Sequence, residues 1–359
     1  MALAGCATRP LSFGCPRLTE FRYVVHDEAL TARVVGPATR SLATELTRAL
    51  GRAASPRTQT VDTRSILVLS GGGPWGAFGA GFLTGWSGST AHPRPQAFNL
   101  VTGVSTGALQ ATDVFLGTKQ DTALEHAYTI ERESDLVRRR GIVSGALAGS
   151  FAGTRPLEAR IRAALVPLYD RVAAEGAKGR LLLVGTVDAL DGRMYAVDLT
   201  RIARELTGTE RADCYAGALM ASAAVPIAFD RVEISGRPYF DGGVRRSVFV
   251  ADIQAAAART VQQGRCLQPI YILINGDPGI APIARLARGL LPTLGRLRTL
   301  AFDQIELGSI EDVARAAPAG SETYIVSAAG NRCGPDDAGH GALFDPAFMR
   351  CLIAYGRSR

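Results

Sequence analysis

The hydrophobic positions fall into short continuous runs that alternate with stretches of helical spacing. Apolar runs that predict strands lie at 65–69, 98–101, 181–187, 193–197 and 270–274, with further candidates at 21–25 and 323–326. Apolar residues spaced three to four apart predict helices near 39–53, 77–83, 108–111, Leu124, 157–172 and 252–261. This alternation predicts an α/β fold with a mostly parallel central sheet between helices.

The same pattern suggests how the 359 residues are organised. We interpret 1–64 as an N-terminal leader or extension and 65–255 as a catalytic domain. Residues 256–359 would complete the same fold, because no linker in the sequence is long enough to mark an independent second domain.

An amphipathic stretch runs from Ile283 to about Leu307. Such a pattern is compatible with a membrane-facing helix, but a helix packed on the core produces it more often, and we expect the latter. No apolar run reaches about 18 residues, so we expect no membrane span.

A serine stands at the apex of a predicted strand, turn and helix. Ser105 lies in the motif G-V-S-T-G, between Gly103 and Gly107, directly after the apolar run 98–101. In a nucleophile elbow the flanking glycines allow a sharp turn that exposes the serine hydroxyl beyond the strand end. The alternative is a glycine-rich turn in which the serine only caps the helix. The motif alone favours neither.

A second glycine-rich turn joins strand 65–69 to the next helix. Gly71, Gly72 and Gly73 are consecutive, and Gly76 follows Pro74 and Trp75. Consecutive glycines leave backbone N–H groups free to converge on one point. We therefore expect an anion site, for a phosphate or for the oxyanion of a tetrahedral intermediate.

Nucleotide binding is the main competing interpretation of this loop, because its spacing also fits G-x-G-x-x-G. A dinucleotide site needs an acidic residue about 20 positions later. No Asp or Glu occurs between Asp62 and Asp113, and no Gly-Lys-Ser/Thr follows as in a P-loop. The oxyanion interpretation is therefore favoured.

An aspartate follows a third strand-like run. Asp241 ends the segment Tyr239-Phe240-Asp241 and precedes Gly242 and Gly243. Its carboxylate could lie at the edge of a site. Taken alone, an ordinary Asp-Gly hairpin turn is the more frequent explanation.

Taken in this order, the three motifs resemble those of the patatin-like phospholipases, over roughly residues 65–255. The small-residue segment 221–229 is also similar to that family. The resemblance implies a three-layer α/β/α fold and a Ser105–Asp241 dyad without histidine. It also implies an oxyanion hole built from the glycine loop and lipid acyl-ester hydrolysis of the phospholipase A or lysophospholipase type, without a cofactor. Family members often have Arg or Lys where Trp75 stands, which weakens the expectation of a phosphorylated head group.

Two alternatives remain open at this stage. Ser105, Asp241 and His340 follow the chain order of an α/β-hydrolase triad, but His340 lies in a polar, glycine-flanked segment typical of surface. A catalytically inactive lipid-binding protein is the second alternative. We expect no metal, because the sequence has no histidine pair or C-x-x-C with ligand spacing and no calcium-loop pattern.

The net charge of +7 comes almost entirely from scattered arginines, since Lys119 and Lys178 are the only lysines. Scattered arginine does not indicate a nucleic-acid footprint. It is compatible with modest attraction to an anionic membrane surface, where a lipid or phospholipid substrate would be found.

The cysteines bear on the cellular compartment. Leu3-Ala4-Gly5-Cys6 resembles the box at which bacterial lipoproteins are lipidated, although only two residues precede it. If translation starts upstream, we expect a lipoprotein of the bacterial envelope anchored through Cys6; otherwise we expect a cytoplasmic protein. Cys214 is predicted to be a buried thiol, and the remaining four permit three pairings: Cys15, Cys266, Cys333 and Cys351. The sequence gives no prediction of oligomeric state.

Overall fold

A computed structural model describes residues 10–25, 41–53, 65–141, 144–145, 148–262, 269–279, 285–286, 288–316, 322–334 and 342–359. Its centre is a large mixed sheet in the order β1-β10-β11-β7-β4-β3-β12-β13, with β8 paired to β7 and β2 to β8. The strands are β1 (Leu11–Phe13), β2 (Arg22–Val24), β3 (Ile66–Leu69), β4 (Leu100–Val104), β7 (Leu181–Asp188), β8 (Met194–Asp198), β10 (Val232–Ile234), β11 (Arg237–Asp241), β12 (Ile270–Ile274) and β13 (Thr323–Ser327).

The five strands from β7 to β13 run parallel, whereas β8 and β11 pair with β7 antiparallel. A small second sheet contains β5 (Arg138–Arg139), β6 (Ser150–Gly153) and β9 (Ile227–Phe229). The helices are α2 (Leu42–Ala53), α3 (Gly76–Ser87), α4 (Thr106–Leu116), α5 (Asp121–Tyr128), α7 (Arg155–Leu165), α8 (Tyr169–Ala177), α9 (Leu199–Glu205), α10 (Gly208–Ser222), α11 (Val250–Gln262), α12 (Leu290–Ala316) and α13 (Pro346–Arg357).

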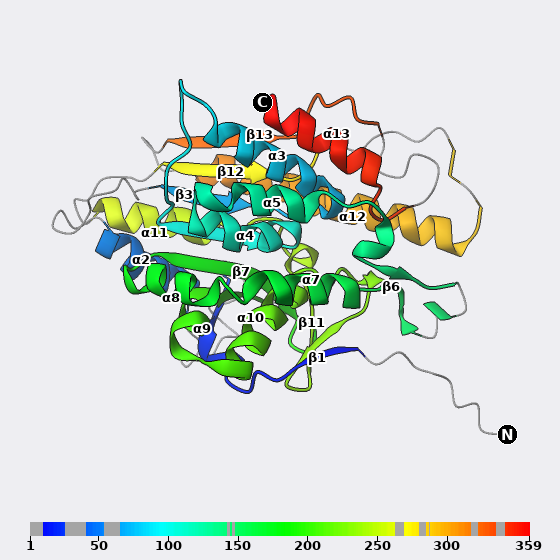
Figure 1. Ribbon diagram of the computed structural model, residues 1–359, viewed down its shortest axis with the longest axis horizontal. Coiled ribbons are helices and arrows are strands. Elements are labelled where there is room, and N and C mark those ends of the chain that lie inside the picture. The colour runs from blue at the N-terminus through cyan, green and yellow to red at the C-terminus, as the bar shows by residue number, and fades with distance from the viewer. Residues whose placement is uncertain are drawn as a thin grey trace.

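Helices cover both faces of the central sheet (Figure 1), and the residues of β3 show why. Leu67 and Leu69 point into a core formed with α3, α4 and α10. Ile66 and Val68, which alternate with them, point into a second core formed with α2 and α11. A strand buried on both faces must be apolar at every position. The predicted three-layer α/β/α arrangement is confirmed.

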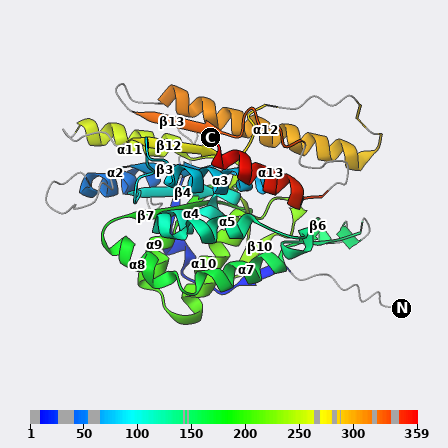
Figure 2. The ribbon, with the colours of Figure 1, turned by 45° about the horizontal axis from the view of Figure 1, so that its top comes forward.

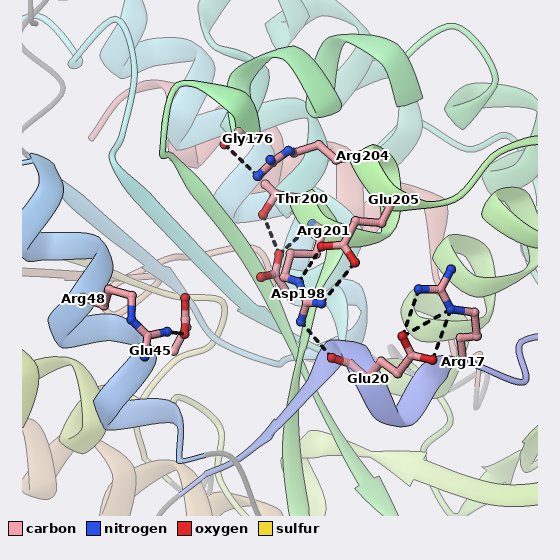
Figure 3. A network of polar contacts seen from close by, with 10 residues as sticks. All are labelled: Arg17, Glu20, Glu45, Arg48, Gly176, Asp198, Thr200, Arg201, Arg204 and Glu205. Carbon is pink, nitrogen blue, oxygen red and sulfur yellow. Dashed lines mark hydrogen bonds and ion pairs between the residues drawn. The ribbon is translucent and has the colours of Figure 1, made fainter.

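The N-terminal residues differ from the leader that the sequence suggested. Their described parts contribute β1, β2 and α2 to the same fold, because β1 pairs with β10 and β2 pairs with β8. Figure 3 shows a further connection. Arg201 of α9 donates a hydrogen bond of 2.7 Å to the carbonyl oxygen of Glu20 and also binds the carboxylate of Glu205. The fold therefore does not begin at residue 65.

The prediction of a free thiol at Cys214 is wrong. Cys214 forms a disulfide with Cys15, and Cys333 forms one with Cys351. Cys214 lies in α10 and Cys15 lies just after β1, so the first bond fastens the N-terminal segment to the helix beside the central sheet. Cys266 lies outside the described residues.

Removing the Cys15–Cys214 bond is expected to destabilise the protein strongly. It closes a loop of 199 residues, and the chain-entropy model assigns such a loop about 5 kcal/mol. The matched control is Cys333→Ser with Cys351→Ser, which opens a loop of only 18 residues and costs about 3 kcal/mol on the same model. Chemical denaturation of the two double variants measures the difference. Equal free energies of unfolding for the Cys15/Cys214 variant and the parent would contradict the expectation.

Two further elements depart from the predictions. The stretch 157–172 forms two helices, α7 and α8, because Pro167 interrupts the spacing between them. The amphipathic stretch forms α12, which contacts the second core through Ile310 but does not bury its leucines there as expected. Ser309 is its only buried side chain among those described. None of the described helices is both long and apolar enough to cross a membrane.

Candidate active site

Ser105 lies at the sharp turn between β4 and α4, as the sequence predicted. Its φ is 54°, in the left-handed region that non-glycine residues rarely adopt, and its side chain is almost buried. Gly107, two residues later, must be glycine because the end of β3 lies too close for a side chain. A Cβ on Gly107 would lie 2.5 Å from the carbonyl oxygens of Leu69 and Ser70. A Cβ on Gly103 would overlap the carbonyl oxygen of Gly107.

A second serine, which the sequence analysis missed, holds this turn. The backbone N–H of Ser105 donates to Ser222 Oγ at 3.0 Å, and Ser222 Oγ donates to the carbonyl oxygen of Gly185 at 2.6 Å. Ser222 therefore connects the strained residue to β7. The only sequence signal was its place in the small-residue segment at the end of α10.

Asp241 reaches the same place along the same edge of β7 as β4, because β11 continues that edge beyond the end of β4 and β8 pairs with the opposite edge. It pairs with Thr186 in that strand, while Val104 pairs with the adjacent Gly185. A Cβ on the following Gly242 would lie 2.6 Å from the Gly185 carbonyl oxygen and 3.1 Å from Val104 Cγ1. The turn after Asp241 therefore packs against the end of β4, where Ser105 begins the next turn.

The carboxyl group of Asp241 is 1% exposed and only partly satisfied. Oδ1 accepts the Gly243 N–H at 2.6 Å, whereas Oδ2 has no hydrogen-bond partner among the described residues. Burial raises the pKa of Asp241 to about 7, although the nearby Ser105 side chain and the Gly243 N–H both lower it. At neutral pH this carboxyl can therefore both take and return a proton, with Oδ2 as the available atom.

A pH profile is expected to report this group. If Asp241 acts as a base, kcat/KM falls tenfold per pH unit below a pKa of about 7, because the protonated carboxyl cannot accept a proton. The measurement is ester hydrolysis between pH 4 and pH 9, with stability checked at each pH. An acidic limb near the ordinary aspartate pKa of about 4 would contradict the assignment.

The glycine loop lies against the serine. A Cβ on Gly71 would lie 3.3 Å from Ser105 Cβ. Gly72 has a φ of 148°, and a Cβ there would overlap the carbonyl oxygen of Asn275. Gly73 has a φ of 54° but faces open space within 4 Å. The loop is thus packed against Asn275 at Gly72, whereas at Gly73 it borders open space.

The backbone hydrogen bonds narrow the predicted set of oxyanion donors. The N–H of Gly71 donates to Ser247 O at 3.4 Å, and the N–H of Gly76 donates to Gly73 O and Pro74 O. Pro74 has no N–H. The N–H groups of Gly72 and Gly73 have no acceptor within the part of the chain that the structure describes. They are the loop's candidates for holding an anion.

A buried polar network supports this loop from beneath. Asn275, directly after β12, donates from its backbone N–H to Ser70 Oγ and from Nδ2 to Ser70 O and Gln110 Oε1. Gln110 of α4 donates to the Gly76 carbonyl oxygen at 2.7 Å. Both ends of the loop are therefore fixed by side chains that the sequence analysis did not single out.

The side of the loop at Trp75 is apolar. The Trp75 ring packs perpendicular to the ring of Phe348 in α13, with the ring centroids 5.1 Å apart. Family members often have Arg or Lys at this position, whereas Trp75 here contacts another aromatic ring. His340 and Cys6 lie outside the described residues.

The comparison with protein families agrees with this arrangement. A family model for patatin-like phospholipases matches residues 67–252, which contain the glycine loop, Ser105 and Asp241. A comparison with curated protein sequences finds no match. Among solved structures, VipD from Legionella pneumophila is similar at 8% identity and a TM-score of 0.35, covering 83% of this chain and 67% of that one. With its family model spanning more than half of its length, the chain belongs to the patatin-like phospholipase family.

Proposed function

We propose that this protein hydrolyses acyl esters of lipids with a Ser105–Asp241 dyad, through an acyl-enzyme. Membership of a lipid acyl hydrolase family supports the reaction class. The observation that carries the mechanism is the buried Asp241 carboxyl beside Ser105, with Oδ2 unpaired and a pKa raised to about 7.

In the first half-reaction, Ser105 Oγ attacks the ester carbonyl carbon while its proton passes to Asp241 Oδ2. The carbonyl oxygen becomes an oxyanion, which the N–H groups of Gly72 and Gly73 would stabilise. When the intermediate collapses, the C–O bond to the alcohol breaks and the alcohol leaves with the proton from Asp241.

In the second half-reaction, a water molecule attacks the acyl-enzyme and gives its proton to Asp241. Collapse of the second oxyanion releases the fatty acid and returns the proton to Ser105 Oγ. One carboxyl thus serves as base and acid in turn, which requires a pKa near the working pH. The pKa of Asp241 meets that requirement.

Release of fatty acid tests this proposal. The substrates are a short-chain ester and phospholipid vesicles, each with and without chelator, and the comparison is between the parent and Ser105→Ala. We expect hydrolysis by the parent that chelator leaves unchanged, and none by the variant. A parent that binds lipid but hydrolyses neither substrate would instead support the inactive lipid-binding alternative.

Anchoring is a separate proposal, motivated by Leu3-Ala4-Gly5-Cys6. We infer that a chain translated from an upstream start is lipidated on Cys6 and held at a bacterial envelope membrane. Mass spectrometry of that longer product would show a diacylated Cys6. An unmodified Cys6 in the cytoplasmic fraction would overturn this localisation without affecting the dyad.

A further inference from the structure

The N-terminal half of α12 and Leu286 form an unusual surface. Leu286, Leu294, Leu297 and Leu300 are between 37% and 59% exposed, four of the nine large exposed hydrophobic side chains among the described residues. In α12, Leu294, Leu297 and Leu300 are three residues apart, so they share one side of the helix. We call these four residues the leucine patch. Its exposure is costly in water and calls for an apolar partner.

The segment that carries the leucine patch has only positive charges, and the nearest acidic residue along α12 is Asp303, which interacts with the charge of Arg296. Residues 285–300 contain Arg285, Arg288, Arg296 and Arg298 and no acidic residue. Arg285, Arg288 and Arg296 form no ion pair with the described residues. The first turn of α12 also lacks an acidic residue, so nothing there offsets the positive end of the helix dipole. The missing partner is therefore apolar inside and anionic at its surface.

The surface borders a cavity beside β9. Leu294 and Arg298 line a cavity of about 300 Å³ together with Ile227 of β9. Ile227 is itself 45% exposed and has a φ of 71°, which a β-branched residue rarely adopts. It follows closely after Ala224, whose carbonyl oxygen accepts the Asp241 N–H at 3.0 Å.

Further along α12, Phe302 approaches the dyad more closely. A Cβ on Gly243 would lie 3.5 Å from Phe302 Cε1, and Gly243 is the residue whose N–H binds Asp241. Figures 1 and 2 both show α12 extending past the central sheet on the side where β6 lies. One helix thus connects an exposed leucine patch to the candidate catalytic groups.

We infer that the leucine patch, with Arg285, Arg288 and Arg296, docks this protein on a bilayer that contains anionic phospholipids. The leucines enter the boundary between head groups and acyl chains, while the arginines contact lipid phosphates. Docking in this pose brings the cavity beside Ile227 against the membrane, so that a lipid reaches Ser105 from the bilayer. This last step rests on the proposed function, whereas the docking itself does not.

Vesicle flotation tests the docking. All proteins carry Ser105→Ala so that the lipid stays intact, and the vesicles are phosphatidylcholine with or without phosphatidylglycerol. We expect binding that needs phosphatidylglycerol and weakens at high salt. Arg285→Gln, Arg288→Gln and Arg296→Gln together are expected to lower the partition coefficient by about 100-fold. Leu297→Ser with Leu300→Ser is expected to lower it by about 10-fold or more.

The controls remove similar groups elsewhere. Val166→Ser deletes an apolar side chain that is 70% exposed, and Arg259→Gln deletes an exposed arginine of α11. Both are expected to bind vesicles like the parent. Direct insertion is measured with Leu297→Trp, whose fluorescence should shift to the blue on anionic vesicles, whereas that of Val166→Trp should not.

Three results would overturn the inference: equal binding to both vesicle types, unchanged binding of the arginine and leucine variants, or no blue shift at position 297. A dimeric parent that binds no vesicles and becomes monomeric with the leucine variant would assign the surface to self-association instead. Hydrolysis of a short-chain ester, measured on proteins that keep Ser105, separates docking from catalysis. If the docking variants still hydrolyse the short-chain ester, the dyad is intact in them. If the parent binds vesicles but does not hydrolyse the ester, only the proposed function has failed.

Discussion

Ser105→Ala is expected to lower kcat for ester hydrolysis by about 10⁴-fold or more, because no other group can form the acyl-enzyme. Asp241→Asn is expected to cause a loss of similar size, since an amide cannot accept the serine proton. Steady-state hydrolysis of a short-chain ester measures both. Neither change opens a large cavity, so both variants should unfold at or above the temperature of the parent.

The Asp241→Asn variant has a distinctive effect on stability. The pKa of Asp241 is raised from its ordinary value of 3.8 to about 7 in the folded protein. The folded state therefore holds this proton more tightly than the unfolded state, and the stability of the parent falls as pH rises between those values. The amide has no charge to bury, so the variant should gain thermal stability relative to the parent at pH 8. A large loss at that pH would indicate a structural role instead.

His340→Ala is the control for the triad alternative. The dyad mechanism gives this histidine no part, so the variant should keep most of the activity of the parent. A loss as large as that of Ser105→Ala would replace the dyad with a Ser105–Asp241–His340 triad.

Gly73→Ala is expected to lower kcat by about 10²–10³-fold with a smaller change in KM, because the oxyanion contact strengthens in the transition state. The structure makes Gly73 the better position to change within the loop. Its Cβ would have no atom of the described residues within 4 Å and would instead fill the space in front of the loop. On Gly72 the Cβ would overlap Asn275, so Gly72→Ala should reduce thermal stability as well as activity.

The matched control is Gly208→Ala. Gly208 has a φ of 56°, almost the same as the 54° of Gly73, and also faces open space. Both variants therefore bear the same left-handed strain of about 1 kcal/mol, but only one lies beside Ser105. Equal activities of the two variants, or an effect of Gly73→Ala confined to KM, would reject the oxyanion role.

The parts of the site that the sequence predicted are those fixed by local geometry. A glycine-flanked serine after an apolar run folds into a turn whatever surrounds it, and the same holds for the glycine loop. The contacts that order these turns join distant residues. Ser222 and Asn275 hold backbone groups of Ser105 and Ser70 across separations of 117 and 205 residues, which no local pattern reveals.

The same limit explains the larger errors. The disulfide joins Cys15 to Cys214, and β1 and β2 enter the sheet beside strands formed about 170–220 residues later. Periodicity in 283–307 predicted a helix correctly but not its surroundings. Leucines spaced for a core face indicate only that an apolar environment is needed, and α12 leaves Leu294, Leu297 and Leu300 exposed.

Labelling with a fluorophosphonate probe, followed by peptide mass spectrometry, tests the central claim most directly. The probe reacts only with a serine that a neighbouring base has activated. The account predicts one adduct, on Ser105, at pH 8, with labelling that slows below a pH of about 7 and disappears in Asp241→Asn. An adduct on another serine, or undiminished labelling of Ser105 in Asp241→Asn, would contradict it.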